Sequence, residues 1–171
     1  MALDLPAAAR AAHAAADAAR HEILPRFRHV AVETKQDGSP VTEADRAAEQ
    51  AIRAVLREHD PTIGILGEEF GAEGASDGLR WVVDPIDGTI GFSRGIPLFS
   101  TLIALLEDGE PRLGLIDLPA LDERTVGWQG GGVTRNGTPV RVSQQADPRK
   151  ALIAHGDGFA FDHFGARPAL E

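Results

Sequence analysis

The 171-residue chain is long enough for one substantial hydrophobic core, and its apolar and charged contents are ordinary for a globular protein. Its net charge of −9 argues against a nucleic-acid partner, and without any cysteine the sequence excludes disulfides, thiolate zinc sites and cysteine nucleophiles. We find neither a signal-peptide pattern nor a run of about 18 apolar residues, so the sequence predicts no membrane association and a cytoplasmic location.

Two segments in the first third of the chain have the periodicity of amphipathic helices. The first runs from residue 4 to about residue 24, with Pro6 suited to its first turn and Pro25 at its end. The second runs from residue 42 to about residue 59, and its apolar residues recur at helical spacing. We therefore expect two helices, each with one face directed to a core.

The second helix begins with a capping signal. Thr42 is followed three residues later by Asp45, which suits a capping box and places a carboxylate at the positive end of the helix. Taken by itself, this capping role is the preferred interpretation of Asp45. The charged residues between the apolar positions are predicted to point to solvent: Glu49, Arg53 and Arg57.

The remainder of the chain carries short apolar and β-branched runs separated by turn residues, which indicate strands. We expect strands at residues 62–66, 81–83, 98–107, 113–118, 123–128, 133–135 and 140–142. Residues 70–79 and 90–97 are expected to be loops, and Asn136-Gly137 suits a type I′ hairpin turn. The pattern predicts an α+β fold with two helices on one face of a large antiparallel sheet.

The chain is organised around the sequence WVVDPIDGT, a short buried strand that ends in Asp84 and Asp87. Pro85 is expected to end the strand because it has no N–H to donate. Two carboxylates that face one point repel each other unless a cation lies between them, and Mg²⁺ takes carboxylate, water and phosphate oxygens. Gly88 and Thr89 then offer amides and a hydroxyl to an anion beside the metal. The alternative is a plain turn with both acids in water.

Three sequence elements resemble one known family. The stretch DPIDGT at residues 84–89 resembles the D-P-[ILV]-D-G-[TS] signature of the inositol-monophosphatase superfamily, which comprises Mg²⁺-dependent phosphatases. Upstream, GEE at residues 67–69 and KQDGSPVTEAD at residues 35–45 look like that family's G-E-E and K-x-D-x-S-P-V-T-x-x-D elements. Their order and spacing make the match strong. The resemblance implies an inositol-monophosphatase-like lobe and Mg²⁺-dependent hydrolysis of a small phosphate monoester.

The resemblance also implies roles for individual residues. The expected metal ligands are Glu68, Asp84, the Ile86 carbonyl and Asp87. The expected catalytic residues are Glu68, Thr89 and Asp45, and the expected substrate-binding residues are Asp87, Gly88 and Thr89. Glu68 and Thr89 would orient the attacking water, while Asp45 would accept a hydrogen bond from the Thr89 hydroxyl. Glu69 is expected to lie behind the metal ligands or in solvent.

Within the superfamily, residues 95–105 and 114–119 look most like the bacterial histidinol-phosphate phosphatase branch. Histidinol phosphate, an intermediate of histidine biosynthesis, is thus the preferred substrate, and inositol 1-phosphate is the alternative. Gly91 departs from the Asn or Ser expected at its position in both branches, so sugar and nucleotide 3′-phosphates stay open. A further alternative, from another class, is a catalytically silent fragment or subunit that binds metal only.

The family's chains are longer than this one, and the resemblance covers about residues 8–154. We expect a metal-binding α+β lobe at residues 1–146 and the start of a C-terminal α/β lobe, mostly absent, at residues 147–171. The W-D-x-A element of that second lobe does not occur, because neither Trp81 nor Trp128 is followed by aspartate. The sheet face that would pack on it is expected to be an exposed apolar patch. The expected partners are a small phosphorylated metabolite and, in the full-length form, a second copy in a homodimer.

Overall fold

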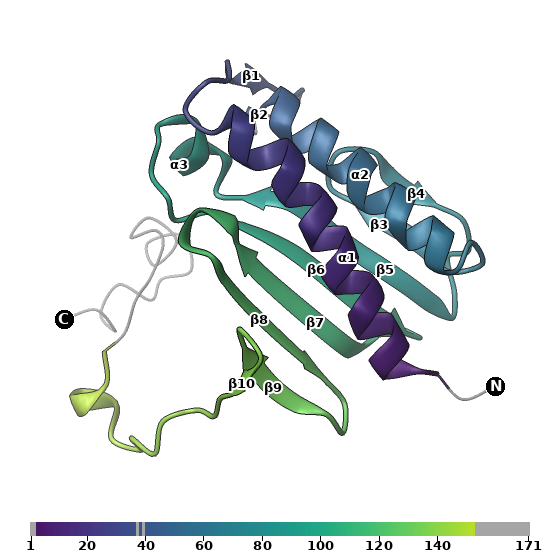
Figure 1. Cartoon of the computed structure of the whole chain (residues 1–171), viewed down its shortest axis with the longest axis vertical. Coiled ribbons are helices and arrows are strands. Elements are labelled where there is room, and N and C mark those ends of the chain that lie inside the picture. Colours follow the sequence, from purple (N-terminus) through teal and green to yellow (C-terminus); the bar gives the residue numbers. More distant parts are fainter. Residues whose placement is uncertain (1–2, 37, 39, 153–171) are drawn as a thin grey trace. The chain divides into compact units, whose positions relative to one another are not determined.

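The computed structural model of the chain describes residues 3–36, 38 and 40–152. The chain divides into two compact units, Met1–Val140 and Arg141–Glu171. In the first unit, two long helices lie across one face of a large sheet (Figure 1). The described part of the second unit includes the 3₁₀ helix η3 (Pro148–Lys150). The predicted start of a second lobe lies mostly outside the described residues and stays a prediction.

Both predicted helices are present, and the second has the predicted capping box. Helix α1 (Leu5–Ile23) begins at Asp4, whose carboxylate accepts a hydrogen bond from the Ala7 amide at 2.9 Å. Helix α2 (Glu43–His59) begins with the capping box of Thr42 and Asp45. The short 3₁₀ helix η1 (Leu24–Arg26) follows α1. Among the described residues, none of the helices is both long and apolar enough to cross a membrane.

The sheet has the strand order β10-β9-β8-β7-β6-β5-β3-β4. Its strands are β3 (Gly64–Gly67), β4 (Gly71–Glu73), β5 (Leu79–Asp87), β6 (Ser100–Glu107), β7 (Glu110–Leu118), β8 (Glu123–Trp128), β9 (Gly132–Arg135) and β10 (Thr138–Pro139). Neighbouring strands are antiparallel except β3 and β5, which pair in parallel. A separate ribbon pairs β1 (Glu33–Thr34) with β2 (Pro40–Val41). The structure thus confirms the predicted α+β fold.

Several predicted loops and boundaries are wrong. Within the expected loop of residues 70–79, β4 pairs with β3, because a glycine-rich edge strand has no alternation to reveal it. The short helix α3 (Thr89–Ser93) begins just before the expected loop of residues 90–97 and occupies its first four residues. The hairpin at Asn136-Gly137 forms, with φ of 47° and 77° at its two turn residues, but β10 occupies residues 138–139 rather than 140–142.

The core lies between the helices and the sheet. Alternation along β5 directs Trp81 and Val83 toward the helices, where both are buried. Helix α2 contacts β5, and α1 contacts β6, β7 and β8. The 3₁₀ helix η2 (Pro119–Leu121) follows β7. The other face of the sheet carries an apolar groove of about 620 Å³, lined in part by Leu66, Val82, Leu102, Ala104 and Ile116. An apolar face opposite the helices is therefore present, and its packing on a second lobe stays a prediction.

A buried carboxylate joins α1 to the sheet. Asp117 on β7 is fully buried and accepts two hydrogen bonds from Arg20 of α1, both at 2.7 Å, and one from Arg124 of β8 at 2.8 Å. Arg20 also pairs with Asp122, whose side chain is 90% exposed. Arg20 therefore makes two ion pairs, one with a buried aspartate and one with an exposed aspartate.

We expect Asp117→Asn to lower the free energy of unfolding by about 2–3 kcal/mol, because it leaves two guanidinium groups without their buried counter-charge. Asp122→Asn should leave it nearly unchanged, because exposed ion pairs contribute little. Both values can be measured by urea unfolding. If both variants lowered the free energy of unfolding by the same amount, the larger contribution that we expect from the buried ion pair would be contradicted.

Candidate metal centre

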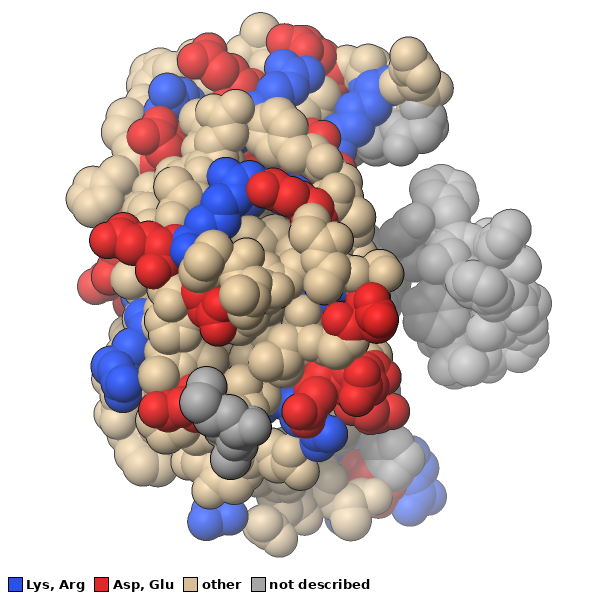
Figure 2. All heavy atoms as spheres, turned by 90° about the vertical axis from the view of Figure 1, so that its right-hand side faces the viewer, with Lys and Arg blue, Asp and Glu red and all other residues tan. Residues whose placement is uncertain are grey.

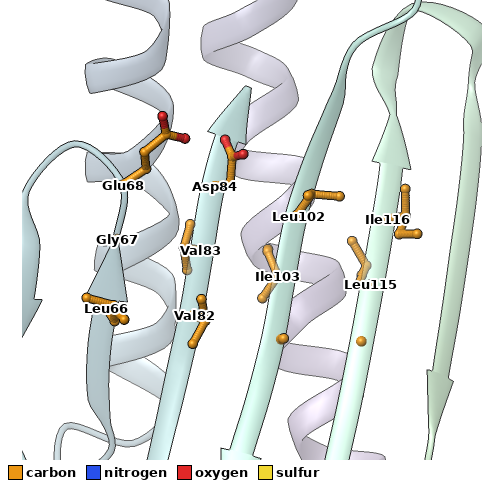
Figure 3. A pocket seen from close by; sticks show the side chains of 12 residues that line it. Leu66, Gly67, Glu68, Val82, Val83, Asp84, Leu102, Ile103, Leu115 and Ile116 are labelled. Atoms are coloured by element: carbon orange, nitrogen blue, oxygen red, sulfur yellow. The ribbon is translucent and has the colours of Figure 1, made fainter. Parts of the chain in front are cut away.

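The motif aspartates lie where two parallel strands end. Because β3 and β5 run in the same direction, Glu68, directly after β3, lies beside Asp84 near the end of β5. The Glu68 amide donates to the Val83 carbonyl at 3.1 Å, which continues the ladder by one bond. Figure 3 shows the Glu68 and Asp84 carboxylates pointing toward each other at one end of the apolar groove.

Pro85 does not end β5 as predicted. The ladder with β6 is interrupted after Asp84 and resumes at Asp87, which lies opposite Ser100. The fully buried hydroxyl of Thr101 donates to the Pro85 carbonyl at 2.8 Å, so a side chain from β6 supports the irregular segment. Asp84 keeps the regular register opposite Leu102, and the bulge that follows it shifts Asp87 out of the regular alternation of the strand.

The bulge also sets the direction of the next two groups. The Asp87 carboxylate accepts from the Ser100 hydroxyl at 3.4 Å, and the residue is exposed. The Ile86 side chain is buried, while its carbonyl accepts from the Thr89 hydroxyl at 3.1 Å. Of the four predicted metal ligands, the structure therefore brings Glu68 and Asp84 face to face.

Asp45 contacts the motif threonine as well as its own helix. Its Oδ2 accepts from the Thr42 amide at 2.8 Å and from the Thr42 hydroxyl at 2.6 Å, and its Oδ1 accepts from the Thr89 hydroxyl at 3.2 Å. Burial raises the pKa of Asp45, whereas the bonds from Thr42 and Thr89 oppose that rise. Because Thr89 has one hydroxyl proton, Asp45 and the Ile86 carbonyl compete for it.

Lys35 is a cation that the sequence prediction did not assign to the site. Its Nζ lies 2.7 Å from Glu69 Oε1 and 3.4 Å from Glu68 Oε1. The Glu69 side chain is only 5% exposed, so it lies behind Glu68 rather than in solvent. Burial raises the pKa of Glu69, and Lys35 partly offsets that rise. The signal for Lys35 was its place as the first residue of the KQDGSPVTEAD segment.

Helix α3 holds the Gly-Thr step in place. Gly88 has a left-handed backbone with φ of 92°, and a Cβ there would lie 3.3 Å from the Leu98 carbonyl oxygen, so glycine suits the position. Phe92 of α3 is fully buried, with ring centroids 5.6 Å from Phe27 and 4.9 Å from Phe99. After Gly88 the chain therefore forms a helix held by aromatic packing, where we predicted a loop.

The electrostatics of the site are unbalanced. Burial, the neighbouring Glu68 carboxyl and the charge of Asp87 together raise the pKa of Asp84 to about 8. Lys35 supplies one positive charge, which it shares with Glu69. An all-oxygen set of carboxylates with too few cations fits a hard divalent ion such as Mg²⁺.

These residues fit a metal site that is partly open to water rather than one enclosed by protein ligands. Within the described part of the chain, no three acidic or histidine side chains already converge in a geometry that would enclose a metal ion. Glu68 and Asp84 face each other, and the charge of the exposed Asp87 lies close enough to raise the pKa of Asp84. Mg²⁺ retains several waters in protein sites, so a partial protein shell suffices.

Comparison with known proteins defines the class to which this α+β lobe belongs. Residues 4–162 match the inositol monophosphatase family. Histidinol-phosphatases from Chlorobaculum parvum and Mycobacterium tuberculosis are 45% and 47% identical over 126 and 141 residues. These matches cover 74% and 81% of this chain, and 49% and 54% of those proteins. An inositol-1-monophosphatase from Mesorhizobium japonicum is 45% identical over 113 residues, or 66% of this chain and 42% of that protein.

A solved structure shares the fold. The extragenic suppressor protein suhB from Bartonella henselae superposes with a TM-score of 0.76 at 33% identity, over 81% of this chain and 55% of that one. The chain belongs to the inositol monophosphatase family. It spans about half the length of the curated relatives it matches.

The raised pKa of Asp84 predicts opposite effects of one substitution on stability and on metal binding. A carboxyl whose pKa rises from 3.8 to about 8 on folding destabilises the folded state increasingly as the pH rises between those values. Without metal at pH 7.5, Asp84→Asn should therefore raise the free energy of unfolding by on the order of 1–2 kcal/mol. The gain is no larger because solvent around the partly exposed Asp84 screens part of the repulsion.

The wild-type chain should melt at a higher temperature with Mg²⁺ than with EDTA, and the same variant should lose this rise. Thermal unfolding with EDTA and with Mg²⁺ measures both effects, and Glu58→Gln, an exposed acid on α2, is the control. A metal-free Asp84→Asn protein that is less stable than wild type at pH 7.5 would contradict the assigned repulsion.

Proposed function

We propose that the chain forms the metal-binding half of a Mg²⁺-dependent phosphomonoesterase whose substrate is histidinol phosphate. The observation that carries this proposal is the facing pair of Glu68 and Asp84, two carboxyl groups that stay together without a metal by retaining a proton at neutral pH and that a divalent cation would bind in place of that proton. Membership of the inositol monophosphatase family supports the reaction class. The activity of the whole protein remains a proposal, because this chain spans about half of its relatives.

The roles of the residues follow from their contacts. Glu68, Asp84, Asp87 and the Ile86 carbonyl would hold the ion, and bound Mg²⁺ would lower the pKa of a water and neutralise phosphate oxygens. The exposed Glu68 carboxylate would accept a proton from the attacking water, and Thr89 would orient that water. Asp45 would fix the Thr89 rotamer through the 3.2 Å contact. The Gly88 and Thr89 amides, beside Asp87, would bind the phosphate.

The choice of alcohol rests on the relatives. The two histidinol-phosphatases favour histidinol phosphate, while the inositol-1-monophosphatase, at 45% identity, keeps inositol 1-phosphate as the second candidate. A chain that binds metal without turnover is the alternative from another class. Groups that recognise the alcohol would come largely from the part of the relatives that this chain does not span.

The surface suits a small phosphorylated partner. Acidic and basic side chains alternate over the face in Figure 2, so the net charge of −9 is not gathered there into one field. Near the metal centre, Lys35 and the ion would provide the local positive charge that a phosphate requires. A cytoplasmic location and homodimer formation in the longer form are parts of the same proposal.

Phosphate release tests the function. Histidinol phosphate, inositol 1-phosphate and a nucleotide 3′,5′-bisphosphate are each assayed with Mg²⁺ and with EDTA. The assays use this chain alone and a chimera that adds the remaining part of the Mycobacterium tuberculosis histidinol-phosphatase. We expect Mg²⁺-dependent release from histidinol phosphate by the chimera, and little or none by the chain alone because one half leaves the alcohol unoriented.

Asp84→Asn in the chimera should lower kcat/KM by at least about a thousandfold, because the metal clamp loses a charged ligand. Glu58→Gln should leave kcat/KM unchanged. Release that persists in EDTA would rule out the metal mechanism, and preference for inositol 1-phosphate would replace the proposed substrate. Mg²⁺ binding without turnover in the chimera would favour the silent subunit.

A further inference from the structure

Two charged residues of α2 are buried, against the prediction that they point to solvent. Glu49 is 0% exposed and Arg53 is 3% exposed, and Arg53 Nε donates to Glu49 Oε1 at 2.8 Å. Burying charged groups is unfavourable unless they are paired and hydrogen-bonded. The remaining bonds of this pair show which part of the fold it serves.

Glu49 accepts hydrogen bonds from the turn that carries Glu68. Strand β3 ends at Gly67 and β4 begins at Gly71, so the turn consists of Glu68, Glu69 and Phe70. The Glu69 amide donates to Glu49 Oε2 at 2.7 Å, and the Phe70 amide donates to Glu49 Oε1 at 3.3 Å. The Glu68 amide donates to the Val83 carbonyl. All three amides of the turn therefore have a partner, and two of them share one carboxylate.

Arg53 reaches the far side of the same turn. Its Nη2 donates to the Gly71 carbonyl at 2.6 Å, and its Nη1 lies 3.1 Å from Glu73 of β4. The Glu49–Arg53 pair thus joins α2 to the last two residues of the turn and to β4. An apolar pair of similar size could fill the space, but it could not accept the two amides or donate to the carbonyl.

Gly67 allows this contact. A Cβ built on Gly67 would lie 1.9 Å from Glu49 Oε1 and 2.7 Å from Arg53 Nη2. Its backbone does not have the left-handed φ that would itself favour glycine. The glycine of the GEE element is therefore required by the approach of the Glu49 carboxylate to the strand.

We propose that Glu49, held by Arg53, is a positioning residue that sets the place of Glu68 at the metal centre. Glu49 does not contact the metal site; it acts through the backbone of the turn. The inference rests on the proposed function, because it assumes that Glu68 is a metal ligand. It deepens that function by giving a buried, charged side chain of α2 a role in metal affinity rather than in stability alone.

Amide exchange and Mg²⁺ affinity in the full chain test the two halves of the inference. Glu49→Gln keeps the size of the side chain but replaces one acceptor oxygen with an NH₂ group that cannot accept from a turn amide. We expect hydrogen exchange of the Glu69 and Phe70 amides, followed by NMR, to become roughly tenfold faster. Mg²⁺ affinity, measured by calorimetry, should fall roughly 10- to 100-fold, as for other residues that orient metal ligands.

Ile52→Val is the control, because Ile52 is buried on the same helix and its side chain makes no hydrogen bond. It should lower the melting temperature without changing turn exchange or Mg²⁺ affinity. In a Glu68→Gln background, Glu49→Gln should add little further loss of Mg²⁺ affinity, because both changes act on one ligand.

Gly67→Ala gives an independent test that leaves Glu49 in place. The added methyl group should displace the carboxylate and reproduce both effects of Glu49→Gln. Gly114→Ala is its matched control, because a Cβ on Gly114 in β7 meets nothing within 4 Å.

The outcomes separate the inference from the proposed function. If wild type binds Mg²⁺ and Glu49→Gln weakens binding no more than Ile52→Val does, the inference is overturned and the metal site stands. If Gly67→Ala leaves both readouts unchanged, the inference is also overturned. If wild type shows protected turn amides but no saturable Mg²⁺ binding, the proposed function fails, and the role in metal affinity fails with it.

Discussion

The parallel pairing of β3 with β5 is the constraint on which the candidate site depends. In an otherwise antiparallel sheet, this one pair places two strand ends at the same edge, so that Glu68 and Asp84 meet. An antiparallel pair would place the end of one strand beside the start of the other. Other features of the site support this meeting point: the bulge braced by Thr101, the ammonium of Lys35 and the turn held by Glu49.

The repulsion between carboxyl groups at the site destabilises the fold. Buried acids elsewhere in the unit have strong partners, as Asp117 has in Arg20 and Arg124. Asp84 instead faces another carboxyl, and its pKa rises accordingly. A group kept in such an unfavourable environment is typical of functional sites, because a bound cation relieves the repulsion that folding creates. The same feature makes metal binding and metal-free stability respond in opposite directions to neutralisation of Asp84.

Local signals predicted much of the architecture. Helical periodicity identified α1 and α2, the capping box identified the start of α2, and Asn136-Gly137 identified the hairpin turn, because these features depend on residues a few positions apart. The acidic motif at Asp84 and Asp87 was visible for the same reason. The glycine-rich strand β4 and the short helix α3 were missed, since β4 pairs with a neighbouring strand and α3 is held by aromatic packing across the chain.

The sequence by itself determined the two helices, the capping box of α2, the strand-rich remainder, and the acidic motif with its family resemblance. Only the tertiary structure decided which charged residues are buried. Periodicity placed Glu49 and Arg53 outside, because a charge without partners is unfavourable in a core. Their partners Glu69, Phe70 and Gly71 lie 18 to 21 residues further along the chain, and Asp117 lies 97 residues from Arg20. Such hydrogen bonds exist only after the chain has folded, and no local pattern in the sequence encodes them.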